Sequence, residues 1–207
     1  MKKSILLFLF AMIISNLLQA QLPISAGLKI GFNTSKMPTE ITNISDIKSQ
    51  GQNGFLAGAF VRIKLTKFYI QPEVYFTKKG GDFQYSNTGN IYTQQSSFKT
   101  VDVPLLFGIK ILDFKAFNFR LMAGPVASFI TDKSVSYQVN GVNLPAVPSP
   151  TLNFKNTIWG FQAGAGIDIL NFTLDVRYEW GINNISDYSE MTSKTKILHV
   201  GLGMKLF

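Results

Sequence analysis

Residues 172–182 read FTLDVRYEWGI, in which two types of residue alternate. Its even positions are apolar or aromatic, from Phe172 to Ile182, whereas its odd positions carry Thr173, Asp175, Arg177, Glu179 and Gly181. Alternation with a period of two predicts a strand that has one apolar face and one polar face. The pattern alone does not decide whether the apolar face meets a protein core or lipid.

The same alternation recurs along the chain. The further segments that show it are residues 24–33, 55–65, 68–77, 101–111, 117–129, 159–169 and 198–206. With residues 172–182 they make eight predicted strands. An even number of strands, each near the ~9–11 residues that cross a hydrocarbon layer at a tilt, is typical of bacterial outer-membrane barrels. The sequence therefore predicts an all-β fold, an eight-stranded antiparallel up-and-down transmembrane β-barrel.

The connections between these segments alternate between short and long. Residues 66–67, 112–116 and 170–171 are short, whereas residues 34–54, 78–100, 130–157 and 183–195 are long and polar. Such alternation places the short turns and both chain ends at one end of a barrel. Outer-membrane barrels have short periplasmic turns and long extracellular loops, so we expect periplasmic termini. A soluble lipocalin-like barrel that carries apolar ligands, with its apolar side inward, remains an alternative.

The amino terminus has the features of an export signal. Lys2 and Lys3 precede an apolar stretch over residues 5–14, and residues 18–20 read LQA, which suits signal peptidase. We expect residues 1–20 to be a cleaved signal peptide and residues 21–207 to form one barrel domain. The chain contains no cysteine, so neither a lipid-anchored precursor nor a disulfide is expected.

Composition favours lipid as a partner over nucleic acid. The net charge is +8, but the lysines and arginines occur singly apart from two adjacent pairs, Lys2-Lys3 and Lys78-Lys79, without the basic patch that phosphate tracking needs. Charged residues make up 15% of the chain, which also has 18 phenylalanines, a bias that is unusual for a surface facing water. We expect outer-membrane lipid around the barrel and no nucleic-acid binding.

The polar faces of the strands predict a charged lumen. An eight-stranded barrel has an interior just wide enough for side chains to fill it, so we expect ion pairs and no diffusion pore. A narrow water-filled path, or a path for protons or a substrate along Glu73, Asp175, Arg177 and Glu179, remains an alternative. The predicted lumen charge network comprises Lys29, Arg62, Lys64, Glu73, Asp102, Lys110, Arg120, Asp168, Asp175, Arg177, Glu179 and Lys205. Trp159, Tyr178 and Trp180 are expected to form an interfacial aromatic belt.

Several segments resemble the Bacteroidetes outer-membrane β-barrel family that includes PorT-like proteins. The segments are residues 27–33 (GLKIGFN), 71–80 (QPEVYFTKKG), 103–106 (VPLL), 123–125 (AGP), 166–168 (GID), 175–178 (DVRY) and 201–207 (GLGMKLF). The resemblance implies a barrel of the OmpX and OmpA transmembrane type. It also implies that Phe207 acts as an insertion signal, read by the barrel-insertion machinery, although Phe207 departs by one residue from the alternation. PorT is associated with protein secretion, so an accessory role in secretion or transport is an alternative function.

No residue pattern indicates chemistry. His199 is the sole histidine, and without a second histidine or a cysteine no metal site is expected. Gly164 and Gly166 form no nucleotide loop, because no predicted helix follows them. We therefore expect no cofactor, no catalytic residue and no enzyme activity. The leading hypothesis is a structural or adhesive role at the cell envelope, in which the long loops contact an extracellular ligand or partner protein.

Overall fold

The computed structural model describes residues 24–36, 38–41, 48–87, 89–114, 116–143, 156–183 and 191–206. The predicted signal peptide over residues 1–20 and the predicted insertion signal Phe207 lie outside the described residues. In the described part of the chain, no helix has the length and apolar character needed to span a membrane.

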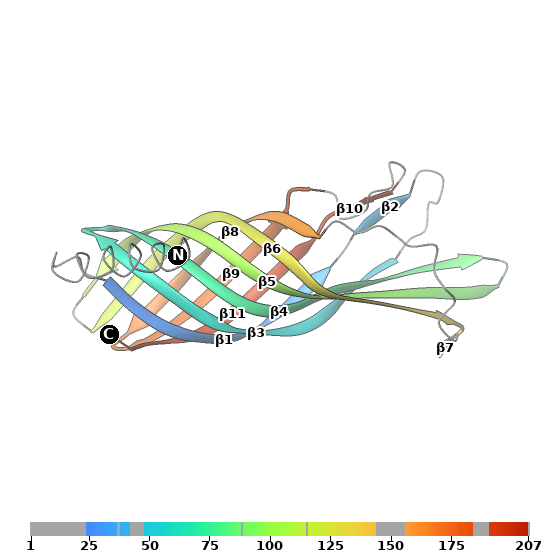
Figure 1. Cartoon of the computed structure of the whole chain (residues 1–207), viewed down its shortest axis with the longest axis horizontal. Coiled ribbons are helices and arrows are strands. Elements are labelled where there is room, and N and C mark those ends of the chain that lie inside the picture. The colour runs from blue at the N-terminus through green and yellow to red at the C-terminus, as the bar shows by residue number, and fades with distance from the viewer. Residues whose placement is uncertain are drawn as a thin grey trace, which may run out of the picture.

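Eight strands form a closed ring (Figure 1). They are β1 (Ile24–Lys36), β3 (Lys48–Leu65), β4 (Phe68–Asn87), β5 (Asn90–Asp113), β6 (Phe117–Val139), β8 (Thr157–Ile169), β9 (Phe172–Gly181) and β11 (Lys196–Lys205). The order in the sheet is β5-β4-β3-β1-β11-β9-β8-β6, and pairing of β5 with β6 closes the ring. All pairings are antiparallel between strands that follow one another in the ring. The predicted eight-stranded up-and-down barrel is confirmed.

Three short strands among the described residues lie outside this ring. β2 (Thr39–Ile41) pairs with β10 (Met191–Ser193) in a separate two-stranded sheet, and β7 (Val142–Asn143) turns back and pairs antiparallel with the end of β6. Asn140 and Gly141 join β6 to β7 with positive φ angles of 51° and 81°. Positive φ at both central residues is what a type I′ hairpin requires, and Asn-Gly is its favoured sequence.

The short turns gather at one end of the barrel. Residues 66–67 join β3 to β4, residues 114–116 join β5 to β6, and residues 170–171 join β8 to β9. Backbone hydrogen bonds link neighbouring turns, from Lys110 N–H to the carbonyl of Lys67 and from Leu170 N–H to that of Ala116. Pairing of Gly27 with Lys205 places the first and last strands at this same end.

The predicted long loop over residues 78–100 is wrong. β4 and β5 stay paired along these residues as far as Asn87 and Asn90, and β6 continues alongside to Val139. The residues are rich in Gln, Ser, Thr and Tyr, polar types that occur in paired strands as well as in loops. Polar composition therefore did not mark the absence of strand. We call residues 80–87, 89–97 and 132–143 the arm; β4, β5 and β6 extend there beyond the rest of the barrel (Figure 1).

The ring has apolar side chains outside and polar side chains inside. Phe32 and Phe76 on the outer face are 75% and 68% exposed, whereas Arg62 and Glu179 on the inner face are 0% exposed. On β5 the outward residues are apolar from Val101 to Ile111. Eleven residues at ~3.3 Å per residue, tilted by ~40°, give a band of ~25 Å, the height expected of a barrel in a hydrocarbon layer. A soluble carrier of apolar ligands needs the opposite sidedness.

Candidate functional site

The lumen is filled by charged side chains of opposite sign. Among the described residues, the buried charged groups besides His199 are five cations and five acids. The cations are Lys29, Arg62, Lys79, Arg120 and Arg177, and the acids are Glu73, Asp102, Asp168, Asp175 and Glu179. A buried charge is tolerated when it is paired and hydrogen-bonded, so this balance allows the polar faces of all the strands to be enclosed.

Asp168 organises the cluster nearest the short turns. Its carboxylate accepts hydrogen bonds from Arg62 at 2.6 Å and from Arg120 at 3.1 Å. The ring of Tyr69 contacts both guanidinium groups, with its centroid 5.2 Å from that of Arg62 and 5.9 Å from that of Arg120. The three strands β3, β6 and β8 are thereby tied together across the lumen.

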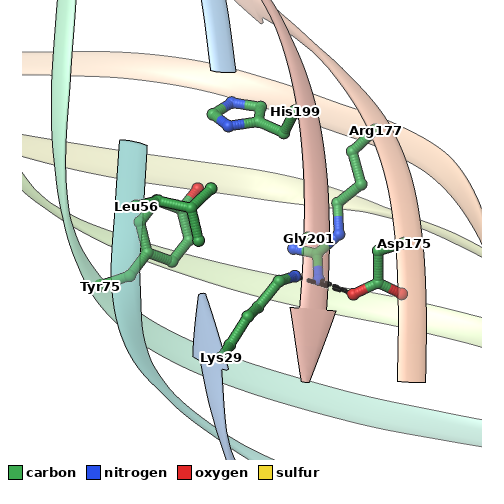
Figure 2. A pocket seen from close by; sticks show the side chains of 7 residues that line it. All are labelled: Lys29, Leu56, Tyr75, Asp175, Arg177, His199 and Gly201. Atoms are coloured by element: carbon green, nitrogen blue, oxygen red, sulfur yellow. Dashed lines mark hydrogen bonds and ion pairs between the residues drawn. The ribbon is translucent and has the colours of Figure 1, made fainter. Parts of the chain in front are cut away.

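Glu73 and Asp175 hold the central cluster, of which Figure 2 shows Asp175 with Lys29 and Arg177. Arg177 donates to both oxygens of Glu73, at 2.9 and 2.5 Å, and to Asp175 at 2.8 Å. Lys29 donates to Asp175 at 2.8 Å, and Arg120 also donates to this carboxylate. Gly201 leaves the room into which the Lys29 side chain extends, because a Cβ at that position would lie 2.5 Å from Lys29 Cε.

Glu179 holds the third cluster, toward the arm. It accepts hydrogen bonds from Lys79 and Gln162, both at 2.7 Å, and lies 3.1 Å from Nε2 of His199. Lys79 also pairs with Asp102 at 2.7 Å. Three polar layers therefore follow one another along the barrel axis.

These layers leave little free space. The gap lined by Lys29, Leu56, Tyr75, Asp175, Arg177, His199 and Gly201 has no room for a water molecule (Figure 2). A network of paired side chains at this density matches the filled interior that a barrel of eight strands has. The geometry gives no support to a substrate path through the residues that line this gap.

Three of the predicted lumen residues lie at the rim of the turn end. Lys110 pairs with Asp113 at 2.8 Å, Lys205 lies 3.9 Å from Asp168, and Lys64 is half-buried. The other nine are buried as described above. Lys79 was missed, because the pair Lys78-Lys79 was assigned to a loop; continuing the alternation of residues 68–77 by one step would have placed it inward.

The predicted belt aromatics lie on the outer face. Trp159 and Trp180 are exposed there, and Tyr178 is half-buried. The rings of Tyr178 and Trp180 contact each other with centroids 4.7 Å apart. All three lie on the half of their strands that is remote from the short turns, because the turn between β8 and β9 is at residues 170–171. An amphipathic ring at the edge of an apolar band suits the interface between lipid and water.

Among the residues that the structure describes, the inner face has no arrangement that we can assign to catalysis. His199 is buried against Glu179, and its Nδ1 atom has no hydrogen-bond partner in this part of the chain. Within the described ranges, no three His, Cys, Asp or Glu residues are grouped so that they could hold a metal ion. The expectation that the chain is not an enzyme stays a prediction.

Comparison with known proteins identifies the type of chain. The model of a family described as outer membrane protein beta-barrel domain matches residues 19–187. No protein of curated function matches in sequence.

Solved structures of low sequence identity are similar over most of the chain. Ail, the attachment invasion locus protein of Yersinia pestis, is 11% identical with a TM-score of 0.43, and the match covers 88% of this chain and 99% of Ail. OprG from Pseudomonas aeruginosa is 12% identical with a TM-score of 0.48, covering 88% and 95%. Neisserial surface protein A is 11% identical with a TM-score of 0.42, covering 86% and 97%.

Proposed function

The chain belongs to the outer membrane protein β-barrel domain family, and from this premise we propose that it is a non-conducting barrel that presents its arm outside the cell for contact with another surface. The observation that carries the proposal is the division of the molecule into a filled cylinder and a projecting sheet. The lumen is occupied by paired charges, so transport through it is not favoured. Beyond the apolar band, β4, β5 and β6 continue as a sheet of mostly polar residues.

The orientation in the membrane is part of this proposal. We assign the turn end, with the first and last strands, to the periplasm and the arm to the cell exterior. Barrels of this membrane place short turns inside and long extensions outside, which supports the assignment. A protease site inserted between Asn87 and Asn90, where β4 turns into β5, would be cut on intact cells. Cleavage only after the outer membrane is broken would overturn the orientation.

The closed lumen is tested by conductance. The purified barrel, inserted into planar bilayers, is expected to give no stepwise currents, because its ion pairs span the interior. Regular single-channel steps that disappear when the protein is omitted would contradict a non-conducting barrel.

The contact role is tested by truncating the arm. Asp82 and Gln95 are directly paired, so residues 83–94 can be replaced by a two-residue Asn-Gly turn without breaking the ring. Cells that carry the full chain are expected to attach to collagen-coated or mucin-coated glass better than cells that carry the truncated chain. Equal attachment of the two kinds of cell would exclude the adhesive role. If cells that lack the whole protein are more sensitive to detergent than cells with the full or the truncated chain, the result would point instead to a structural role of the cylinder.

A finer place in the family, among the PorT-like Bacteroidetes barrels, is also a proposal. Apart from Gly80, which begins the arm, the described residues of the segments that resemble them lie in the ring, and two of these residues, Glu73 and Asp175, belong to the lumen network. Glu73 and Asp175 stabilise the barrel. The resemblance therefore supports membership of the PorT-like barrels but does not by itself support a role in secretion. Loss of specific exported surface proteins in a deletion strain would favour the secretion role over contact.

A further inference from the structure

The outer face of the barrel changes from apolar to cationic at the start of the arm. On β4 the outward residue after Phe76 is Lys78, and on β5 the outward residue after Val101 is Lys99. The two lysines are direct partners across the strands, and both are exposed. Lys36 of β1 and Lys196 of β11 form a second such pair, again exposed.

Like charges directly opposite each other in a sheet repel and destabilise it. Lys99 is compensated by Asp132, which lies 2.8 Å away and whose pKa is lowered by the hydrogen bond and the charge of Lys99. The side chain of Lys78 has no ion pair or hydrogen bond with any other residue in the described part of the chain. Among the described residues, Lys78 is therefore a cation at the edge of the apolar band without an acidic partner.

A polar groove lies beside Lys78. Its volume is about 400 Å³, and it is lined by Gln52, Asn53, Lys78, Asp82, Gln95, Ser97, Ser134 and Ser136. Asp82 accepts hydrogen bonds from Gln52 at 2.5 Å and from Gln95 at 3.2 Å, so the carboxylate that forms part of its wall is held in place. The groove is lined by amides, hydroxyls and one carboxylate, without an apolar wall. These groups can pair with the hydrogen-bond donors and acceptors of a sugar.

The position of the groove selects the kind of molecule that can fill it. Phe76 and Val101 lie one outward position from Lys78 and Lys99, so a lipid whose chains lie along the band carries its headgroup to the lysines. A phosphate there would meet Lys78, and a sugar attached to it would reach Asp82 and Ser97. We propose that Lys78 and this groove bind the phosphorylated sugar headgroup of a glycolipid in the outer leaflet. The proposal rests on the proposed orientation, with the arm outside the cell.

The test is binding of lipid A to the purified full-length mature barrel in detergent. Native mass spectrometry with lipid A, with dephosphorylated lipid A and with phosphatidylglycerol separates the contributions of sugar, phosphate and lipid chain. We expect lipid A to be retained most. Lys78→Gln is expected to weaken lipid A binding about 5-fold, the loss that one lysine near an anionic surface gives. Lys67→Gln, which removes an exposed lysine at the turn end, is the matched control and is expected to change nothing.

Ser97→Val tests the sugar separately from the charge. It removes one hydroxyl of the groove and is expected to weaken lipid A binding about 3-fold while leaving phosphatidylglycerol unchanged. Equal effects of Lys78→Gln and Lys67→Gln would overturn the proposal, as would equal retention of phosphatidylglycerol and lipid A. If free glucosamine 1-phosphate at equal concentration competes fully with lipid A, the groove binds a soluble sugar phosphate, and the proposal that it binds a lipid is overturned.

Failure of this inference and failure of the contact role are distinguishable. The truncation of residues 83–94 keeps Lys78, Asp82, Gln95 and Ser97, so the truncated chain retains the groove. It is expected to bind lipid A as the full chain does while losing attachment. Attachment that persists, with lipid A binding intact, would remove the contact role alone.

Discussion

Arg177 on β9 donates two parallel hydrogen bonds, 2.9 and 2.5 Å long, across the lumen to Glu73 on β4. The two residues are 104 positions apart in sequence and lie on strands that are not neighbours in the ring. A paired guanidinium and carboxylate of this geometry has directional hydrogen bonds as well as charge attraction. The pair therefore fixes the distance between opposite walls of the barrel.

Removal of one partner of this pair is expected to destabilise the barrel strongly. Glu73→Ala leaves Arg177 buried with only Asp175 as a close acid, and a broken buried pair costs about 3–5 kcal/mol. The free energy of unfolding, followed by the fluorescence of the two tryptophans in guanidinium and lipid vesicles, measures this cost. In the double variant Glu73→Leu with Arg177→Met, no unpaired charge remains, so the loss is expected to be smaller than the sum of the single losses. Additive losses would show that the two side chains act independently.

The depth of a residue in the apolar band predicts the cost of a charge on the outer face. Leu202 lies between Ile30 and Leu174 in the middle of the band, whereas Leu198 lies opposite Thr34 at its edge. Leu202→Arg is expected to lower the free energy of unfolding in vesicles by about 2–4 kcal/mol, and Leu198→Arg by about 0–1 kcal/mol. Equal costs at both sites would contradict a membrane-embedded band along β11.

The close contact between Gly108 and Tyr69 predicts a steric dependence. A Cβ at Gly108 would overlap the ring of Tyr69, which is 1% exposed and contacts the guanidinium groups of Arg62 and Arg120. Gly108→Ala is expected to lower the free energy of unfolding by about 1–3 kcal/mol through overpacking. In a Tyr69→Ala background the same substitution is expected to cost less than about 0.5 kcal/mol. An unchanged cost in that background would assign the effect to the backbone of β5.

The sequence predicts the ring well because a period of two is a strong signal in a strand with one face in lipid. The segments from Phe172 and Leu198 have apolar residues at every second position, and a slip of one residue would bury apolar and expose ionic side chains. In the arm both faces carry polar residues, such as the buried Gln94 and the half-buried Ser97 on opposite faces of β5. The alternation of apolar and polar residues that indicates a strand is therefore absent there, and the sequence predicts a loop where the structure has a paired sheet.

The candidate site is predicted less completely, because alternation gives the face of a residue but not its depth. Lys64, Lys110 and Lys205 have inward positions yet lie at the rim, where water reaches them. Depth depends on the stagger of the strands, which the pairing registers show but no single segment contains. The groove beside Lys78 combines residues of β3, β4, β5 and β6, and near it the pairing has register shifts between Gly51 and Leu56 and between Lys99 and Thr100.

Lys78 and Lys79 are adjacent in sequence and lie on opposite faces of β4, which gives the sharpest test of sidedness. Lys79 is 1% exposed and pairs with Asp102 and Glu179, so Lys79→Ala leaves two buried acids without this cation. We expect it to lower the free energy of unfolding by about 3–5 kcal/mol, whereas Lys78→Ala, on the outer face, is expected to change it by less than about 0.5 kcal/mol. Guanidinium unfolding in neutral phosphatidylcholine vesicles measures both without a contribution from anionic lipid. Because the two substitutions remove the same atoms from neighbouring residues, a difference between them can only come from the side of the strand. Equal losses would mean that β4 does not keep its alternation past Thr77, and the lumen network would then have to end at Glu179 without Lys79.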